Sequence, residues 1–219
     1  MNKGAKKPVR RNVVSKIANA LNQTGRPSQW TLESRETLHE RFYRIDSVRF
    51  THELHDGGST GVIERELFVR GNVVGVLAYD PKLDSVALVE QFRIGAMYQQ
   101  PDPWTMEIIA GMIDTDESPE EVGVREAYEE AGIKLDELQL VSHYLASPGA
   151  SNEEVFLYYS ETDLRTIGGC HGLPEENEDI RVVVMPAEQV FELLEQGVIR
   201  NALSIIALQW LKLKRAGLA

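Results

Sequence analysis

The sequence of 219 residues predicts an α/β protein in which helices cover a mixed β-sheet. Strand-like and helical segments alternate irregularly along the chain, without the regular strand–helix–strand rhythm of a doubly wound parallel sheet. Apolar residues make up 42% and charged residues 26%, which is close to the average of soluble globular proteins. Because a domain has about 150 residues, this length fits one large domain, or one domain with a small companion.

Residues 1–31 are predicted to form a basic N-terminal arm. Residues 1–32 contain seven Lys or Arg and no Asp or Glu, so the rest of the chain carries a net charge of −18 within a total of −11. The helical spacing of Val13, Ile17 and Leu21 leaves an organelle-targeting helix as the alternative interpretation. The acidic remainder of the chain repels polyanions, so we expect no nucleic-acid partner.

Residues 32–70 are predicted to form a small antiparallel β region. Polar and apolar residues alternate over 41–50, residues 55–58 supply a turn, and 62–69 resumes an extended pattern. Two or three strands of this size are not stable alone. We therefore expect this region to pack on the rest of the chain or on another subunit.

Residues 71–219 are expected to form the main domain. Short β-branched runs that are bounded by turn residues indicate its strands. In its last helix, Leu203, Ile206 and Trp210 recur at intervals of three and four residues, which is typical of one apolar helix face. The expected strands cover 73–79, 86–92, 104–110, 138–146 and 155–160, and the expected helices cover 119–131, 187–196 and 201–215.

A soluble, cytoplasmic protein without a membrane partner is expected. The longest apolar runs fall far short of the roughly 20 residues that span a bilayer, and the N-terminus has no apolar signal core. Cysteine occurs once, at Cys170, which excludes an internal disulfide and a Cys-rich zinc site.

The helix predicted at 119–131 has explicit start and stop signals. Ser118 is a good N-cap, Pro119 suits the first helical position, and Glu121 completes a capping box. Gly132 suits the position that ends a helix. These signals define the bounds of the helix from local sequence alone.

The two faces of this helix differ in chemistry. Glu126, Glu129 and Glu130 fall on one face at spacings of three and four residues, where like charges repel. We expect the opposite face to dock on the core, and it contains Val124, Ala127, Tyr128 and Ala131.

A metal site is the interpretation that best accounts for the charged face. Clustered carboxylate oxygens are the preferred surroundings of Mg²⁺ or Mn²⁺. The Gly-containing loop before the helix lets a main-chain carbonyl, such as that of Ala110, approach the same cation. A solvated charged face is the alternative.

Residues Gly111 to Ile133 match the pattern G-x5-E-x7-R-E-U-x-E-E-x-G-U, where U is apolar, at each fixed position. The chain thereby resembles the Nudix hydrolase family, whose members use divalent metals to hydrolyse a nucleoside diphosphate linked to another moiety. The resemblance implies a Nudix-type α/β/α sandwich with a mixed sheet. It also implies that Glu126, Glu129 and Glu130 bind metal, and that Glu117 and Arg125 form a structural ion pair.

A second resemblance narrows the substrate. Pro148 lies sixteen residues after Gly132, as in the ADP-ribose pyrophosphatase subfamily, and similar stretches extend from about Arg35 to Trp210. This resemblance implies hydrolysis of the pyrophosphate bond of ADP-ribose to AMP and ribose 5-phosphate. The implied cofactor is Mg²⁺, with Mn²⁺ as an alternative ion.

The subfamily also implies roles for residues outside the helix. In the acidic, turn-rich stretch 173–179, which precedes a strand, Glu176 maps to the general base and Glu178 to a metal ligand, whereas composition alone favours a solvated loop. The implied catalytic residues are thus Glu176, Glu126 and Glu130. A homodimer with swapped N-terminal strands is implied as well. Substrate contacts are implied for Arg65, Arg93, Met112, Glu153 and Phe42.

Two alternative functions remain open at this point. A Nudix hydrolase of another nucleoside diphosphate sugar, such as GDP-mannose, would differ in pocket residues that the sequence does not identify. A non-catalytic Nudix-fold nucleotide-binding protein would usually lack glutamates of the pattern, and here all of them are present.

Overall fold

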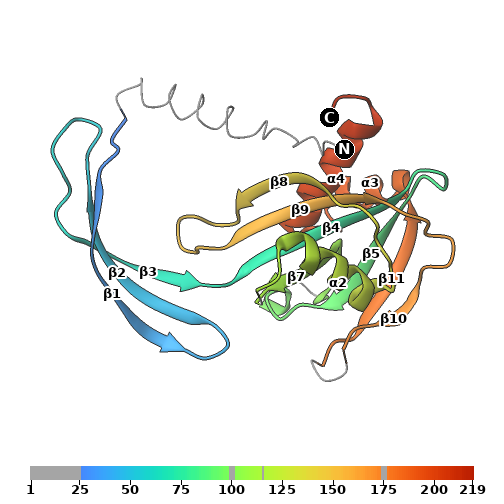
Figure 1. Cartoon of the computed structure of the whole chain (residues 1–219), viewed down its shortest axis with the longest axis horizontal. Helices are drawn as coiled ribbons and strands as arrows, with labels where there is room; N and C mark the ends of the chain where they lie inside the picture. The colour runs from blue at the N-terminus through green and yellow to red at the C-terminus, as the bar shows by residue number, and fades with distance from the viewer. Residues whose placement is uncertain (1–25, 99–101, 115, 174–176) are drawn as a thin grey trace, which may run out of the picture. The chain divides into compact units, whose positions relative to one another are not determined.

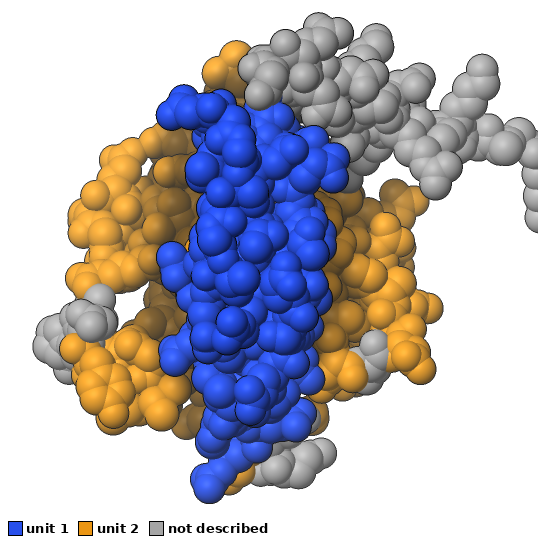
Figure 2. Space-filling view, turned by 90° about the vertical axis from the view of Figure 1, so that its left-hand side faces the viewer, with its two compact units in different colours: residues 1–69 blue, residues 70–219 orange. Residues whose placement is uncertain are grey.

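The computed structural model describes residues 26–98, 102–114, 116–173 and 177–219. The chain divides into two compact units, an N-terminal unit of residues 1–69 and a C-terminal unit of residues 70–219 (Figure 2). Most of the predicted basic arm, residues 1–25, lies outside the described residues. The roles expected for 1–31 and 32–70, as an arm and a dimerising region, stay predictions.

The N-terminal unit contains a three-stranded antiparallel sheet in the order β1-β2-β3. Its strands are β1 (Trp30–Glu40), β2 (Arg44–His52) and β3 (Ile63–Val69). The expected hairpin corresponds to β2 and β3, but β1 was not expected. Because all eleven residues of β1 are exposed, this strand has no alternation of buried and solvated positions that a pattern could reveal.

A buried carboxylate connects β1 and β2. Asp46 on β2 accepts hydrogen bonds from Arg35 and from Thr37 Oγ1 of β1, the latter at 3.0 Å, and forms an ion pair with Arg44 Nε at 3.1 Å. Burial raises the pKa of Asp46, but the hydrogen bonds from Arg35 and Thr37 outweigh burial and hold it below its usual value. These polar contacts favour the observed pairing of the two strands.

The C-terminal unit contains an eight-stranded mixed sheet with the order β10-β11-β5-β4-β9-β8, in which β6 pairs with β5 and β7 with β4. The pair β4 and β9 is parallel and the other pairs are antiparallel. The strands are β4 (Asn72–Asp80), β5 (Ser85–Phe92), β6 (Trp104–Glu107), β7 (Ile109–Ile113), β8 (Gln139–Leu145), β9 (Glu154–Glu161), β10 (Gly169–His171) and β11 (Ile180–Pro186).

Helices cover both faces of this sheet (Figure 1). Alternating residues of β4 point to opposite faces, so Val76 packs in a core with residues of α2 and Leu77 packs in a core with residues of α3 and α4. The helices are α2 (Pro119–Ala131), α3 (Ala187–Glu195) and α4 (Ala202–Arg215), and a short 3-10 turn, η1, covers Ala96–Tyr98. This α/β/α sandwich with a mixed sheet confirms the predicted fold class. None of the described helices is long and apolar enough to cross a membrane.

The local signals around α2 are confirmed. Ser118 is the N-cap, with its hydroxyl accepting from Glu121 N at 3.3 Å, and Glu121 Oε2 accepts from Ser118 N at 2.8 Å. Gly132 ends the helix in the left-handed region at φ 65°. The bounds of the helix agree with the expected 119–131.

The prediction of which face of α2 docks is partly wrong. Val124 and Tyr128 are exposed, at 39% and 57%, and the face against the sheet contains Gly123, Ala127 and Ala131. A Cβ on Gly123 would lie 3.2 Å from Val76 and 3.1 Å from Leu138, so the missing side chain lets the helix approach the sheet closely. The contact therefore selects small residues rather than the most apolar ones.

The expected strand 104–110 is interrupted at Ile108. Its amide N–H donates to Ser204 Oγ on α4 at 2.8 Å, and pairing passes from β5 with β6 to β4 with β7. The interruption brings β7 to the edge of β4, beneath the side chains of α2.

Candidate active site

Helix α2 presents three glutamates of different burial. The side chain of Glu126 is 15% exposed and that of Glu129 is 26% exposed, whereas Glu130 is 3% exposed. Gly111 on β7 faces Glu126, because a Cβ on this glycine would lie only 2.1 Å from Glu126 Cδ. Only a residue without a side chain fits here.

Glu130 is a carboxylate held inside the protein. Its Oε2 accepts from the N–H of Ala110 at 3.0 Å, and its Oε1 accepts from Gln91 Nε2 at 3.5 Å. Burial raises the pKa of Glu130 to about 8, because the charged form loses hydration. The negative charges of Glu126 and Glu178 raise this pKa as well, while the N–H of Ala110 opposes the rise.

Glu126 has a similar environment. Burial raises its pKa to about 7, and the neighbouring charge of Arg125 counteracts part of this effect. The charges of Glu129 and Glu178 raise the pKa further. Two carboxylates one helical turn apart, each with a pKa raised mainly by burial, are a property of functional sites.

Arg125 contacts three carboxylates at once. Its Nε donates to Glu117 Oε2 at 3.2 Å, and its Nη1 donates to Glu126 Oε1 at 3.0 Å and to Glu129 Oε2 at 2.8 Å. Burial lowers the pKa of Arg125, but these neighbouring carboxylates raise it well above its usual value. The guanidinium thus orients the loop before α2 against the charged face of the helix.

A second arginine, Arg93, follows β5 and is influenced by the charge of Glu130 on α2. Arg93 forms a bidentate pair with Glu107, from Nε to Oε1 at 3.2 Å and from Nη2 to Oε2 at 2.9 Å. Thr105 Oγ1 donates to the same Glu107 Oε1 at 2.6 Å. Burial lowers the pKa of Arg93, and the carboxylate of Glu107 raises it above its usual value, with help from Glu130 and Glu178.

Sequence patterns did not identify Glu107, Thr105 or Gln91 as site residues. Their side chains point to the site only because β5 and β6 pair, with Gln91 opposite Thr105 and Val89 opposite Glu107. The one available signal was Glu107, a carboxylate in a largely apolar segment.

The predicted residues of the acidic loop are only partly described. Glu176 lies outside the described residues. Glu178 N donates to Leu173 O at 3.3 Å, and Leu173 N donates to Glu178 Oε2 at 3.4 Å. The charge of Glu178 raises the pKa of both Glu126 and Glu130.

The remaining predicted contacts are distributed over both units. Met112 lies on β7, opposite Val73, and Glu153 forms an ion pair with Arg70 at 3.2 Å. In the N-terminal unit, Arg65 Nη1 donates to the carbonyl of Glu64 at 2.7 Å. Phe42, also in that unit, is 79% exposed and packs edge-on against the ring of Tyr43 at 4.7 Å.

The donor atoms of the α2 site suit a hard divalent cation. They are carboxylate oxygens close to the main chain of β7 at Ala110. The raised pKa values of Glu126 and Glu130 indicate that a nearby positive charge would stabilise their ionised forms. In the described part of the chain, no three His, Cys, Asp or Glu side chains already converge on one point. Arg125 instead binds one oxygen each of Glu126 and Glu129.

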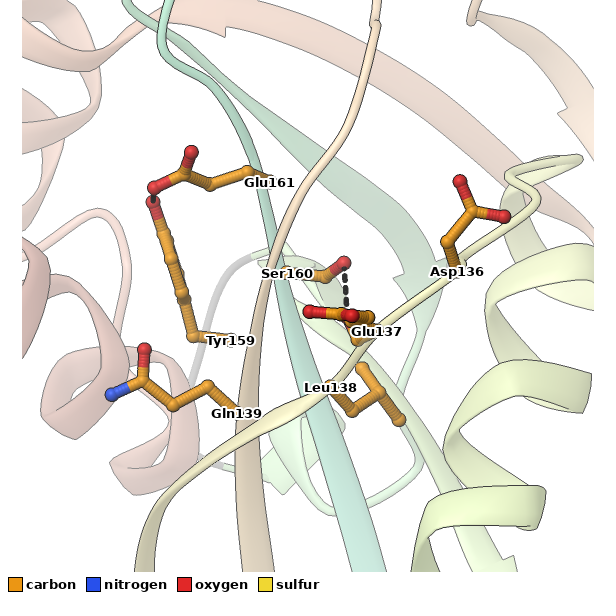
Figure 3. Close-up of a pocket in the computed structure, with 7 residues that line it drawn as sticks. All are labelled: Asp136, Glu137, Leu138, Gln139, Tyr159, Ser160 and Glu161. Carbon is orange, nitrogen blue, oxygen red and sulfur yellow. Dashed lines mark hydrogen bonds between the residues drawn. The ribbon is translucent and has the colours of Figure 1, made fainter. Parts of the chain in front are cut away.

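A separate cavity of about 380 Å³ lies where β8 begins and β9 ends. Within it, Tyr159 Oη donates to Glu161 at 2.9 Å, and Ser160 Oγ donates to the carbonyl of Glu137 at 2.8 Å (Figure 3). Acidic side chains in its walls disfavour an anionic ligand. The cavity is lined by Asp136, Glu137, Leu138, Gln139, Tyr159, Ser160 and Glu161.

Comparisons with known proteins identify a matching family and several relatives of this chain. The family model described as NUDIX domain matches residues 69–207. The chain is 45% identical to the ADP-ribose pyrophosphatase of Haemophilus influenzae over 186 residues, which cover 84% of this chain and 86% of that protein. It is also 45% identical to the ADP-ribose pyrophosphatase of Escherichia coli strain K12 over 185 residues, with 84% and 88% covered.

More distant relatives have other names. The GDP-mannose pyrophosphatase of Cronobacter sakazakii is 36% identical over 178 residues, which cover 81% of this chain and 92% of that protein. A solved structure described as an ADP compounds hydrolase superposes with a TM-score of 0.63 at 21% identity, covering 88% of this chain and 98% of that one. The last similarity concerns the fold.

Proposed function

The chain belongs to the NUDIX family, and on this premise we propose that it is a metal-dependent hydrolase of ADP-ribose. The reaction cleaves the pyrophosphate bond and releases AMP and ribose 5-phosphate. The main support is the half-buried Glu126 and the buried Glu130, which lie one turn apart on α2 where the family pattern has its metal-binding glutamates. The relatives named ADP-ribose pyrophosphatase, at 45% identity over most of the chain, support this substrate.

Mg²⁺ is the proposed cofactor, and Mn²⁺ the alternative. Its proposed ligands are the side chains of Glu126, Glu129, Glu130 and Glu178, and the carbonyl of Ala110. The N–H of Ala110 points to Glu130 rather than into the sheet, and in a strand the C=O of a residue points to the same side as its N–H. When bound, such a cation neutralises the pyrophosphate charge and lowers the pKa of a bound water.

The protein's own groups then orient and activate the reactants. Glu126 and Glu130, one helical turn apart, are proposed as catalytic residues whose carboxylates bind the cation. Glu176 is proposed as the general base that takes the proton of the attacking water, by resemblance to the subfamily. A carboxylate with an ordinary pKa would suffice for this role, because a bound cation would lower the pKa of the attacking water.

Arg93 is proposed to bind the phosphates or ribose of the substrate. Glu107 accepts hydrogen bonds from two nitrogens of the Arg93 guanidinium, Nε and Nη2. These bonds fix the plane of the guanidinium before substrate binds. Arginine suits this role because its planar fork donates parallel hydrogen bonds to phosphate oxygens. The further proposed contacts, from the subfamily, are Arg65, Met112, Glu153 and Phe42.

A homodimer in the cytoplasm is proposed as the working form, with N-terminal strands exchanged between subunits. The N-terminal unit supports this, because β1 exposes Trp30, Leu32 and Leu38 at 71%, 51% and 52%. Burial of such apolar surface stabilises an interface by roughly 25 cal/mol per Å².

Steady-state kinetics on a substrate panel test the proposal. We expect AMP from ADP-ribose in Mg²⁺, with kcat/KM at least about tenfold above that for GDP-mannose. Glu130→Gln and Glu126→Gln should each reduce kcat by about 100-fold or more while the protein stays folded. If GDP-mannose is the better substrate, the protein is a GDP-mannose hydrolase rather than an ADP-ribose hydrolase. Absence of turnover on every nucleoside diphosphate sugar in Mg²⁺ and Mn²⁺ rules out both of these activities.

A further inference from the structure

We propose that His171 and Gly172 are positioning residues that hold Glu178 against the carboxylates of α2. The inference rests on the proposed function, in which Glu178 is a metal ligand. It adds two residues that touch neither the substrate nor the metal. Both act by fixing where the end of β10 meets the end of α2.

The first contact joins β10 to the last turn of α2, and these elements lie side by side (Figure 1). Gly172 N donates to the carbonyl of Glu129 at 3.4 Å. The ring of His171 lies against Gly132, because a Cβ on that glycine would be 2.9 Å from His171 Cε1. The ring is oriented in turn by a hydrogen bond from Nε2 to the carbonyl of Gly168 at 3.0 Å.

The second contact joins Gly172 to Glu178. Gly172 has φ +97°, and a Cβ at this position would lie 2.8 Å from Glu178 Cβ and 3.0 Å from Glu178 O. The hydrogen bonds between Leu173 and Glu178, in both directions, close the same short segment. Gly172 is therefore required for its backbone conformation and also for the approach of Glu178.

Together the two contacts connect α2 to Glu178 through Gly172. The carbonyl of Glu129 belongs to the helical turn that carries Glu126 and Glu130, so Gly172 is tied to the backbone of the proposed metal ligands. Moving Gly172 away from Glu178 would displace one ligand relative to the others. A displacement of about 1 Å in such a site can cost about 100-fold in rate.

The chain offers a matched control at Gly169. This residue has φ +95°, close to that of Gly172, but an added Cβ would meet no atom within 4 Å. Gly169→Ala and Gly172→Ala thus introduce the same methyl group at two positions with similar positive φ, three residues apart. Only Gly172→Ala collides with Glu178.

The test measures Mn²⁺ affinity by isothermal titration calorimetry, together with kcat for ADP-ribose and the Mg²⁺ concentration at half activity. We expect Gly172→Ala to weaken Mn²⁺ binding and raise the half-activating Mg²⁺ concentration by about tenfold, and to lower kcat by about 10- to 100-fold. Gly169→Ala should stay within about threefold of the unmodified protein. Equal effects of the two substitutions would overturn the inference.

A double-mutant cycle with Glu178→Gln separates positioning from general loss of stability. If Gly172 acts through Glu178, Gly172→Ala adds little to the defect of Glu178→Gln in Mn²⁺ affinity, whereas independent effects multiply. Multiplied effects would contradict the inference. If Gly172→Ala does not give a folded protein, His171→Ala replaces it in the same cycle, with the same two outcomes.

The readouts also separate this inference from the proposed function. An unmodified protein that binds Mn²⁺ but does not cleave ADP-ribose contradicts only the proposed substrate, and the cycle in metal affinity still decides the positioning roles. An active enzyme with multiplied effects in the cycle contradicts only the positioning roles.

Discussion

The carboxylate of Glu126 occupies the space that a side chain at Gly111 would fill. A Cβ on Gly111 would lie 2.1 Å from Glu126 Cδ and 2.2 Å from Glu126 Oε1. The backbone of β7 therefore limits where this carboxylate can lie. The glycine that begins the family pattern allows α2 to approach β7 this closely. This relationship leads to the first prediction.

Gly111→Ala should abolish most activity without unfolding the protein. The added methyl group would force Glu126 out of the carboxylate cluster, so we expect kcat for ADP-ribose to fall by about 100-fold. Gly61→Ala is the control, because a Cβ there meets no atom within 4 Å. Retention of near-normal kcat in Gly111→Ala would show that the position of Glu126 is unimportant for turnover.

The stability of the metal-free protein should fall with rising pH because of Glu130. Its pKa rises from an ordinary 4.5 to about 8 in the folded state, so folding favours the protonated form. Its contribution to stability is fully present below pH 4.5 and is lost as pH rises towards 8.

Thermal unfolding in EDTA from pH 5 to pH 9 checks this contribution. We expect Glu130→Gln to gain stability relative to the unmodified protein across this interval, by several degrees in Tm. Other titrating groups are common to both proteins and cancel in the difference. A Tm difference that is independent of pH would contradict the raised pKa of Glu130.

Glu107→Gln should weaken substrate binding more than it slows the chemical step. The substitution removes the negative charge that holds Arg93 in place, so KM for ADP-ribose should rise about tenfold with a smaller change in kcat. Glu90→Gln is the matched control. Glu90 lies on β5, which ends just before Arg93, but its carboxylate accepts from Arg181 Nε at 2.8 Å instead. An equal effect of both substitutions on KM would mean that Arg93 is not oriented by Glu107.

Leu32→Asp should convert the proposed dimer to a monomer. Leu32 and Thr31 are adjacent on β1, so their side chains point to opposite faces of the sheet, and both are exposed. A charge at Leu32 would have to be buried in an apolar interface, whereas the same charge at Thr31 would not. Size-exclusion chromatography with light scattering should therefore give a monomer for Leu32→Asp and a dimer for Thr31→Asp. A dimer in both cases would exclude this face of β1 from the interface.

Helix α2 illustrates what a local pattern can predict. Its caps depend on Ser118, Glu121 and Gly132, which lie within the helix or next to it, so their spacing was sufficient to place both ends. Strand β1 illustrates the opposite case. Its partner β2 and the contact of Arg35 with the buried Asp46 stabilise it, and neither produces a periodic pattern in the sequence of the strand.

The active site divides in the same way. The glutamates of α2 and their suitability for a divalent cation follow from residue type and helical spacing, because one turn of helix brings them together wherever the helix lies. The hydrogen bonds of Glu130 with Ala110 and Gln91, the pair of Arg93 with Glu107, and the approach of Gly172 to Glu178 depend on packing. These contacts join different strands, helices and loops, and long-range packing alone brings such segments within hydrogen-bonding distance.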